Sequence, residues 1–263
     1  MSSRFVQAGA GAIVAAAMLA GCASTARIPS PSTGLSLSAQ IYRPDGGGRY
    51  PAVILLGPCG GVTPHMGDWA RWLNSQGYVA LVVDSLAPRG VSTACEGGRG
   101  PNEFQVGRDA VDALVFARTL PFVDGDRLAV MGWSLGASAA LEASSSRRTS
   151  WPGYADTAPF QGVVAFYPSC YSLDRQTPTP TLLLLAARDD WTPPGPCLDV
   201  VGSDPRLAGR VRLELYPDAL HAFDRPDAKP YLGHAMSYDG GAAGAAHEAV
   251  KAFLAERLAA QRP

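Results

Sequence analysis

Apolar residues follow two different periods along most of the chain. Residues 52–57 and 78–85 are continuous apolar runs, which is typical of strands covered on both faces, whereas residues 35–43 alternate between apolar and polar as a half-buried strand does. Further apolar runs predict four more strands, at residues 127–133, 163–168, 181–187 and 211–217. Apolar residues at helical spacing predict helices at residues 68–77, 103–120, 135–145 and 245–260.

Strands that alternate with helices predict a mostly parallel sheet covered by helices on both faces. We therefore expect a single-domain, doubly wound α/β fold over residues 35–263, without an internal repeat. Right-handed crossovers place the carboxyl ends of the parallel strands along one edge of the sheet. Because ligands bind at that edge in such folds, the loops after the strands are the places to search for chemistry.

The first 21 residues have the pattern of an export signal. Arg4 precedes an apolar stretch of 14 residues, 8–21, which is shorter than the roughly 20 that a membrane span needs. The stretch ends in LAGC and resembles the lipobox of bacterial lipoproteins, so we expect Cys22 to be the lipidated first residue of the mature chain. The alternative is an ordinary secretory signal followed by a chance cysteine.

Residues 22–34 are then expected to be the lipidated cysteine and a short tether, because residues 24–34 are rich in Ser, Thr and Pro. Ala23, rather than an aspartate, follows the cysteine. By analogy with lipoprotein sorting, this favours the outer membrane of a two-membraned bacterium. We expect an exported protein, held in the cell envelope by its lipid and facing the periplasm.

Composition and charge limit the classes of molecule that the protein is expected to bind. The chain is 47% hydrophobic and 17% charged with a net charge of −1, so a buried core is expected. The densest basic cluster is Arg147-Arg148, which argues against a nucleic-acid partner held through its phosphates. No cluster of Cys and His has the spacing of metal ligands, and we expect neither a metal nor an organic cofactor.

Four cysteines remain once Cys22 is set aside, and an even number in an exported chain suggests disulfide bonds. Each lies in a loop that follows a predicted strand. Because loops after consecutive strands lie at the same edge of the sheet, we expect the bonds Cys59–Cys95 and Cys170–Cys197. Four separate reduced thiols are the alternative.

The pentapeptide GWSLG, residues 132–136, lies between a predicted buried strand and a predicted helix. In that context the pattern G-x-S-x-G is typical of a nucleophile elbow, a tight strand-to-helix turn that exposes a serine hydroxyl. Gly132 and Gly136 would leave room for the close approach of the neighbouring strand and helix. The helix N-terminus and the N–H of Leu135 would stabilise an oxyanion that forms beside Ser134.

A serine nucleophile needs a base that is held by an acid, and α/β-hydrolases supply them in the chain order Ser, Asp, His. His221 follows the strand 211–217, and Asp189 and Asp190 follow the strand 181–187. We prefer Asp189 because it lies closer to the strand end; Asp190 would then cap a loop or pair with Arg188.

A second oxyanion donor is expected from the loop after the strand 52–57, which reads GPCGG. Pro58 has no N–H, so the amide of Cys59 is the natural candidate, held in place by the expected disulfide. Gly60 is the alternative donor.

These motifs together resemble the dienelactone hydrolase family of α/β-hydrolases over residues 35–260. The resemblance rests, in order, on AVILLGPCGG, VVDSLAPRG, RLAVMGWSLG, DDWTPPGPC and YPDALHAFD. It implies a hydrolase of small esters or lactones with Ser134 as nucleophile, Asp189 as acid and His221 as base. The founding members use cysteine within G-x-C-x-G, so the serine here favours ordinary carboxylic esters over dienelactone. Many relatives also have His-Gly where this chain has Gly57-Pro58.

Arginines bind the substrate carboxylate in the founding members, and Arg89 lies in a corresponding loop, although a surface ion pair would explain it too. Three aromatic residues that flank the triad could line an apolar pocket or simply pack: Trp133, Trp191 and Phe223. The sequence thus predicts an esterase that passes through an acyl-enzyme. Rival interpretations are a noncatalytic ligand-binding envelope lipoprotein, and a peptidase or thioesterase on the same fold. Residues 146–161 could form a lid or a plain connection.

Overall fold

The computed structural model of the protein describes residues 23–31 and 33–260. The expected export signal and the expected lipid on Cys22 therefore lie outside the described residues. Within that range, no helix is both long enough and apolar enough to cross a membrane.

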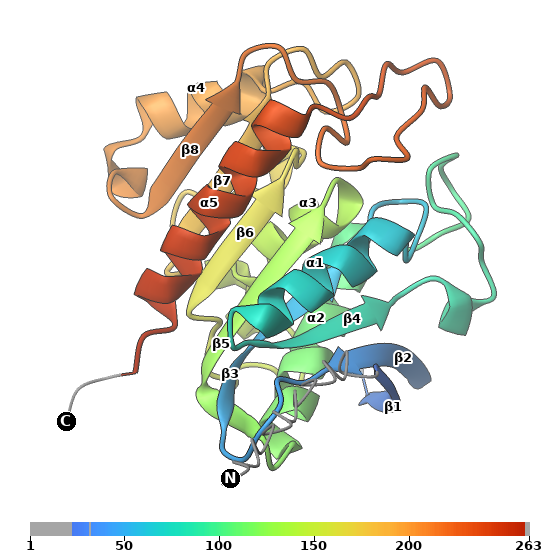
Figure 1. Ribbon diagram of the computed structural model, residues 1–263, viewed down its shortest axis with the longest axis vertical. Coiled ribbons are helices and arrows are strands. Elements are labelled where there is room, and N and C mark those ends of the chain that lie inside the picture. Colours follow the sequence, from blue (N-terminus) through green and yellow to red (C-terminus); the bar gives the residue numbers. More distant parts are fainter. Residues whose placement is uncertain (1–22, 32, 261–263) are drawn as a thin grey trace, which may run out of the picture.

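One sheet of eight strands runs through the molecule in the order β1-β2-β4-β3-β5-β6-β7-β8 (Figure 1). Strands β3 to β8 run parallel to one another, whereas β2 runs antiparallel to both β1 and β4. The strands are β1 (Ser24–Ser30), β2 (Leu35–Tyr42), β3 (Tyr50–Leu56), β4 (Val79–Asp84), β5 (Val123–Trp133), β6 (Gly162–Phe166), β7 (Thr181–Ala186) and β8 (Val211–Tyr216).

Helices cover both faces of the sheet (Figure 1). They are α1 (Pro64–Ser75), α2 (Glu103–Thr119), α3 (Leu135–Ala143), α4 (Gly195–Ser203) and α5 (Gly240–Arg257). Short 3-10 helices occupy Ala87–Arg89, Ser146–Ser150, Cys170–Ser172 and Pro205–Leu207. Alternate residues of β3 enter different cores: Ile54 packs with α2 and α3, and Leu55 packs with α1 and α5. This two-sided burial explains the continuous apolar runs and confirms the predicted α/β fold.

The expected tether is wrong for residues 24–30, which form β1 at the edge of the sheet. Ile28 pairs with Leu37 of β2, and both side chains are fully buried. The Ser, Thr and Pro content indicated a tether, but an edge strand needs few apolar residues and tolerates proline, so the same composition also fits β1. The described part of the domain thus begins before residue 35.

Residues 146–161 form a connection beneath α2 rather than a lid. Trp151 and Tyr154 are buried in the core, and residues 152–154 line a surface cavity with α2 and β1. The sequence also gave no sign of α4, whose residues are interrupted by Gly and Pro.

Candidate functional site

The turn from β5 to α3 has the geometry expected of GWSLG. Ser134 has φ 53° and ψ −115°, a strained combination for a residue with a side chain, and its N–H donates to the carbonyl of Phe166. A Cβ on Gly132 would lie 2.2 Å from the carbonyl oxygen of Gly136, and a Cβ on Gly136 would lie 2.2 Å from that of Leu56. Only glycine fits at either position, because backbone atoms occupy the space.

His221 and Asp189 meet beside this turn. The Nδ1 atom of His221 lies 2.7 Å from Asp189 Oδ2, and both side chains are buried. The other oxygen, Oδ1, accepts from the backbone N–H groups of Trp191 and Thr192, both at 2.9 Å. A carboxylate so engaged can only accept from the imidazole, so Nδ1 carries the proton and Nε2 is left as the basic nitrogen.

Asp190 points elsewhere. Its carboxylate accepts from the N–H of Ala235 and lies 3.4 Å from His234 Nδ1, at the surface. The structure therefore agrees with the preference for Asp189 as the partner of His221.

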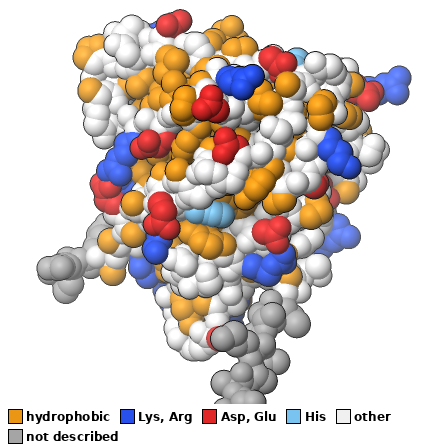
Figure 2. Space-filling model, turned by 45° about the horizontal axis from the view of Figure 1, so that its top comes forward, with side chains coloured by type: hydrophobic (Ala, Val, Ile, Leu, Met, Phe, Trp, Pro, Cys, Tyr) orange, Lys and Arg blue, Asp and Glu red, His pale blue; other side chains and the backbone are white. Residues whose placement is uncertain are grey.

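A pocket of about 420 Å³ contains both Ser134 and His221 in its lining. The rest of its lining is mixed in character and includes the apolar or aromatic side chains of Tyr167, Tyr231 and Met236 and the hydroxyls of Thr63 and Thr93. On the face turned toward the viewer in Figure 2, hydrophobic side chains are exposed among charged and other polar ones. The site can thus admit a small molecule with an apolar portion.

The two expected oxyanion donors flank the serine. Cys59 and Leu135 line a smaller adjoining pocket together with Ser134. The N–H of Leu135 is free of helical bonding by its position in the first turn of α3. Gly60 lines only the larger pocket of the two.

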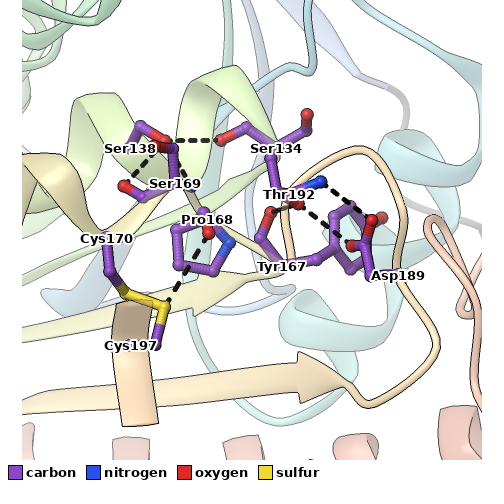
Figure 3. The surroundings of a disulfide bond; sticks show 9 residues. All are labelled: Ser134, Ser138, Tyr167, Pro168, Ser169, Cys170, Asp189, Thr192 and Cys197. Carbon is purple, nitrogen blue, oxygen red and sulfur yellow. Dashed lines mark hydrogen bonds between the residues drawn. A yellow bond between two sulfur atoms is a disulfide. The ribbon is translucent and has the colours of Figure 1, made fainter. Parts of the chain in front are cut away.

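Both expected disulfides are present. Cys59–Cys95 joins the loop after β3 to the loop after β4, and the N–H of Ala94 donates to the carbonyl of Cys59 at 2.7 Å. Cys170–Cys197 joins the segment after β6 to α4 (Figure 3). In that segment Ser169 donates its N–H to the hydroxyl of Ser138, which in turn contacts the carbonyl of Ser134.

Arg89 does not face the pocket, and its expected role in substrate binding is wrong. Its guanidinium forms a bidentate pair with the buried Asp109, at 2.7 and 2.9 Å, and donates to the carbonyl of Ser85. Burial nevertheless raises the pKa of Asp109, opposed by the hydrogen bonds and charge of Arg89.

Of the three aromatic candidates, only Trp191 lines the pocket, with its ring 5.3 Å from that of His221. Trp133 and Phe223 are fully buried in the core, so their expected contact with substrate is wrong. Trp133 is the last residue of β5 and Phe223 lies in the loop after β8, and both pack into the core that α1 and α5 cover.

Two residues that contact His221 or its partner Asp189 were not predicted from the sequence. Tyr167 has its ring centroid 4.6 Å from that of His221, and its carbonyl oxygen lies 2.9 Å from the hydroxyl of Thr192. That hydroxyl also lies 3.0 Å from Asp189 Oδ2 (Figure 3). Thr192 lies within the DDWTPPGPC motif but had been given no role, and the only signal for Tyr167 was its place just after β6.

Groups of three or more His, Cys, Asp or Glu side chains that could hold a metal are absent from the described residues. Three charged residues also line the pocket, Arg225, Asp227 and Lys229, and Arg225 is hydrogen-bonded to Asp227.

The chain is similar to known hydrolases. A Synechocystis sp. protein provisionally named a carboxymethylenebutenolidase is 25% identical over 128 residues, which cover 43% of this chain and half of that protein. The structure of a dienelactone hydrolase-like promiscuous phosphotriesterase from metagenomic libraries is 19% identical, covers 90% of this chain and 99% of its own, and has a TM-score of 0.67. Thermogutta terrifontis esterase 2, phosphorylated by paraoxon, is 15% identical, with 91% and 96% covered and a TM-score of 0.71.

These structural likenesses show the fold, and the matched curated relative is spanned over about half its length. The family model of the dienelactone hydrolase family matches residues 37–258, nearly the whole described domain. The chain therefore belongs to the dienelactone hydrolase family.

Proposed function

We propose that the protein is a serine hydrolase that cleaves small carboxylic esters or lactones through an acyl-enzyme. The observation that carries this proposal is the 2.7 Å contact between His221 Nδ1 and Asp189 Oδ2, in a pocket that also contains Ser134 at the strained turn. A binding protein would have no need to hold a histidine against a buried carboxylate in a pocket that also contains a serine at a strained turn.

In the proposed reaction, Nε2 of His221 accepts the proton of Ser134 as Oγ attacks the ester carbonyl carbon. The amides of Leu135 and Cys59 donate to the oxyanion. The imidazolium returns its proton to the leaving oxygen as the C–O bond breaks, which leaves the acyl group on Ser134. Water, deprotonated by the same nitrogen, then releases the acid and restores the serine.

The test is hydrolysis of p-nitrophenyl esters of increasing chain length by the protein from residue 23, beside Ser134→Ala. We expect turnover of short acyl chains and a loss of at least ~10³-fold in the variant. Labelling of the wild type by a fluorophosphonate, and not of the variant, would identify the nucleophile. A folded wild type that neither hydrolyses these esters nor takes the label would contradict the proposal and favour a binding role.

We also propose that Cys22 is lipidated and anchors the enzyme in the cell envelope, on the outer membrane facing the periplasm. The sequence LAGC followed by Ala23 supports this. Expression of the full chain with a radiolabelled fatty acid should label the wild type and not Cys22→Ser. Equal labelling of both would contradict the anchor.

A further inference from the structure

Asp224 is a buried carboxylate three residues after the proposed base. Its Oδ2 accepts from the indole N–H of Trp69 at 2.9 Å and from that of Trp133 at 2.7 Å. Its Oδ1 accepts from the hydroxyl of Tyr167 at 2.7 Å. The burial of Tyr167 and the neighbouring carboxylate raise the pKa of that hydroxyl, so it remains a donor.

All three donors are neutral, and the adjacent Arg225 is hydrogen-bonded to Asp227 instead. Burying a carboxylate is unfavourable, and an apolar side chain of similar size often stabilises a core as well or better. Fold stability alone therefore does not account for an aspartate at this position.

The three donors come from separate parts of the site. Trp133 directly precedes Ser134, and the ring of Tyr167 lies against His221. Trp69 belongs to α1, which packs over the same face of the sheet. Asp224 itself continues the loop that carries His221, so one carboxylate joins the nucleophile turn, the base loop and the segment after β6.

Each of these segments also holds a strained residue. Ser134, Tyr167 and Ala222 have φ values of 53°, 40° and 59°, in the left-handed region that residues with side chains avoid. Such conformations persist only where the surrounding structure fixes the backbone. The bonds to Asp224 lie one residue from Ser134, at Tyr167 itself, and two residues from Ala222.

We propose that Asp224 is a positioning residue that fixes Ser134 and His221 relative to each other, through Trp133, Tyr167 and the backbone of the His221 loop. The proposal rests on the proposed serine hydrolase activity. It assigns Asp224 no contact with substrate, so the residue acts on the rate of the chemical step and not on substrate binding.

Asp224→Leu and Asp224→Asn test this together. Leucine removes every acceptor, whereas the asparagine amide can accept from both indoles through its oxygen and donate to the Tyr167 hydroxyl through its nitrogen. We expect kcat for a short p-nitrophenyl ester, per fluorophosphonate-titrated site, to fall about 10²-fold in the leucine variant with KM within about threefold. The asparagine variant should stay within about fivefold of wild type.

Asp204→Asn is the matched control, because Asp204 is a buried carboxylate at the end of α4, bonded to Arg206 and away from the pocket. It should lower stability and leave kcat unchanged. If Asp224→Leu does not fold, Trp133→Phe and Tyr167→Phe each remove one bond and should each lower kcat several-fold at constant KM.

Unchanged kcat in a folded Asp224→Leu, or in both phenylalanine variants, would overturn the inference while leaving the proposed function intact. A loss in Asp224→Asn as large as in Asp224→Leu would also overturn it, since charge rather than position would then matter. An inactive wild type that takes no fluorophosphonate would instead remove the proposed function and this inference with it.

Discussion

Removing the Cys59–Cys95 disulfide should lower both stability and activity, whereas removing Cys170–Cys197 should lower stability alone. The bonds close loops of similar length, with sequence separations of 36 and 27. The chain-entropy relation then gives about 3.8 and about 3.5 kcal/mol of unfolding free energy, as upper estimates. The two paired serine variants should therefore be nearly equal in stability.

Their effects on catalysis should differ because only Cys59 supplies a proposed oxyanion amide. The loop that carries it is held by the disulfide and by the 2.7 Å bond from Ala94. Deleting an oxyanion donor costs ~10²–10³-fold in kcat. Loosening this amide without deleting it should cost about tenfold, whereas the serine pair at 170 and 197 should stay within about threefold of wild type.

Urea unfolding at pH 7.5 would measure the two stabilities. Turnover of p-nitrophenyl acetate would be measured at a temperature where near-ultraviolet circular dichroism shows both variants folded, and divided by the fluorophosphonate-titrated site concentration. An equal loss of kcat in the two variants, or none in the variant at 59 and 95, would refute the assignment of the Cys59 amide.

Three further expectations can be checked with single variants. Gly136→Ala should destabilise the protein by at least about 1–3 kcal/mol in urea unfolding, because its methyl group would lie 2.2 Å from a backbone oxygen; Gly244→Ala, in an open stretch of α5, should instead stabilise by up to about 1 kcal/mol. Arg89→Ala should leave KM unchanged and lower the unfolding free energy by about 3 kcal/mol, because the buried Asp109 loses its charged partner. A raised KM would instead support a role for Arg89 in substrate binding. Burial lowers the pKa of His65, so the contribution of its neutral form to stability is present above about pH 6.5 and is lost as pH falls toward the folded-state pKa. Between pH 7.5 and 5.5, the unfolding free energy of His65→Phe should therefore fall less than that of the wild type. An equal fall in both proteins would contradict this.

The functional edge of the parallel sheet and the pairing of the cysteines could be predicted because both follow from one geometric rule. Parallel strands leave their carboxyl ends at one edge, so a residue just after a strand has a known place even when its side-chain direction is unknown. Ser134, Asp189, His221 and all four described cysteines obey that rule.

Side-chain direction is where the sequence was insufficient. Trp133 and Trp191 both lie beside strand ends, yet one is buried in the core and the other lines the pocket. The donors to Asp224 come from three elements that are far apart in the chain, and no local pattern brings them together. Arg89 likewise could be assigned only once its contact with Asp109 was visible.

The pairing of the described cysteines has a consequence for oxidation of the chain. The first cysteine is bonded to the second and the third to the fourth, so the two disulfide-closed loops do not interleave. Four cysteines allow three pairings. If the chain is exported as proposed and its lipid occupies Cys22, an oxidant that joins Cys59, Cys95, Cys170 and Cys197 in the order in which they cross the membrane reaches the native pairing directly. The bond between residues 59 and 95 could then close before residues 170 and 197 have crossed, without reshuffling by a disulfide isomerase.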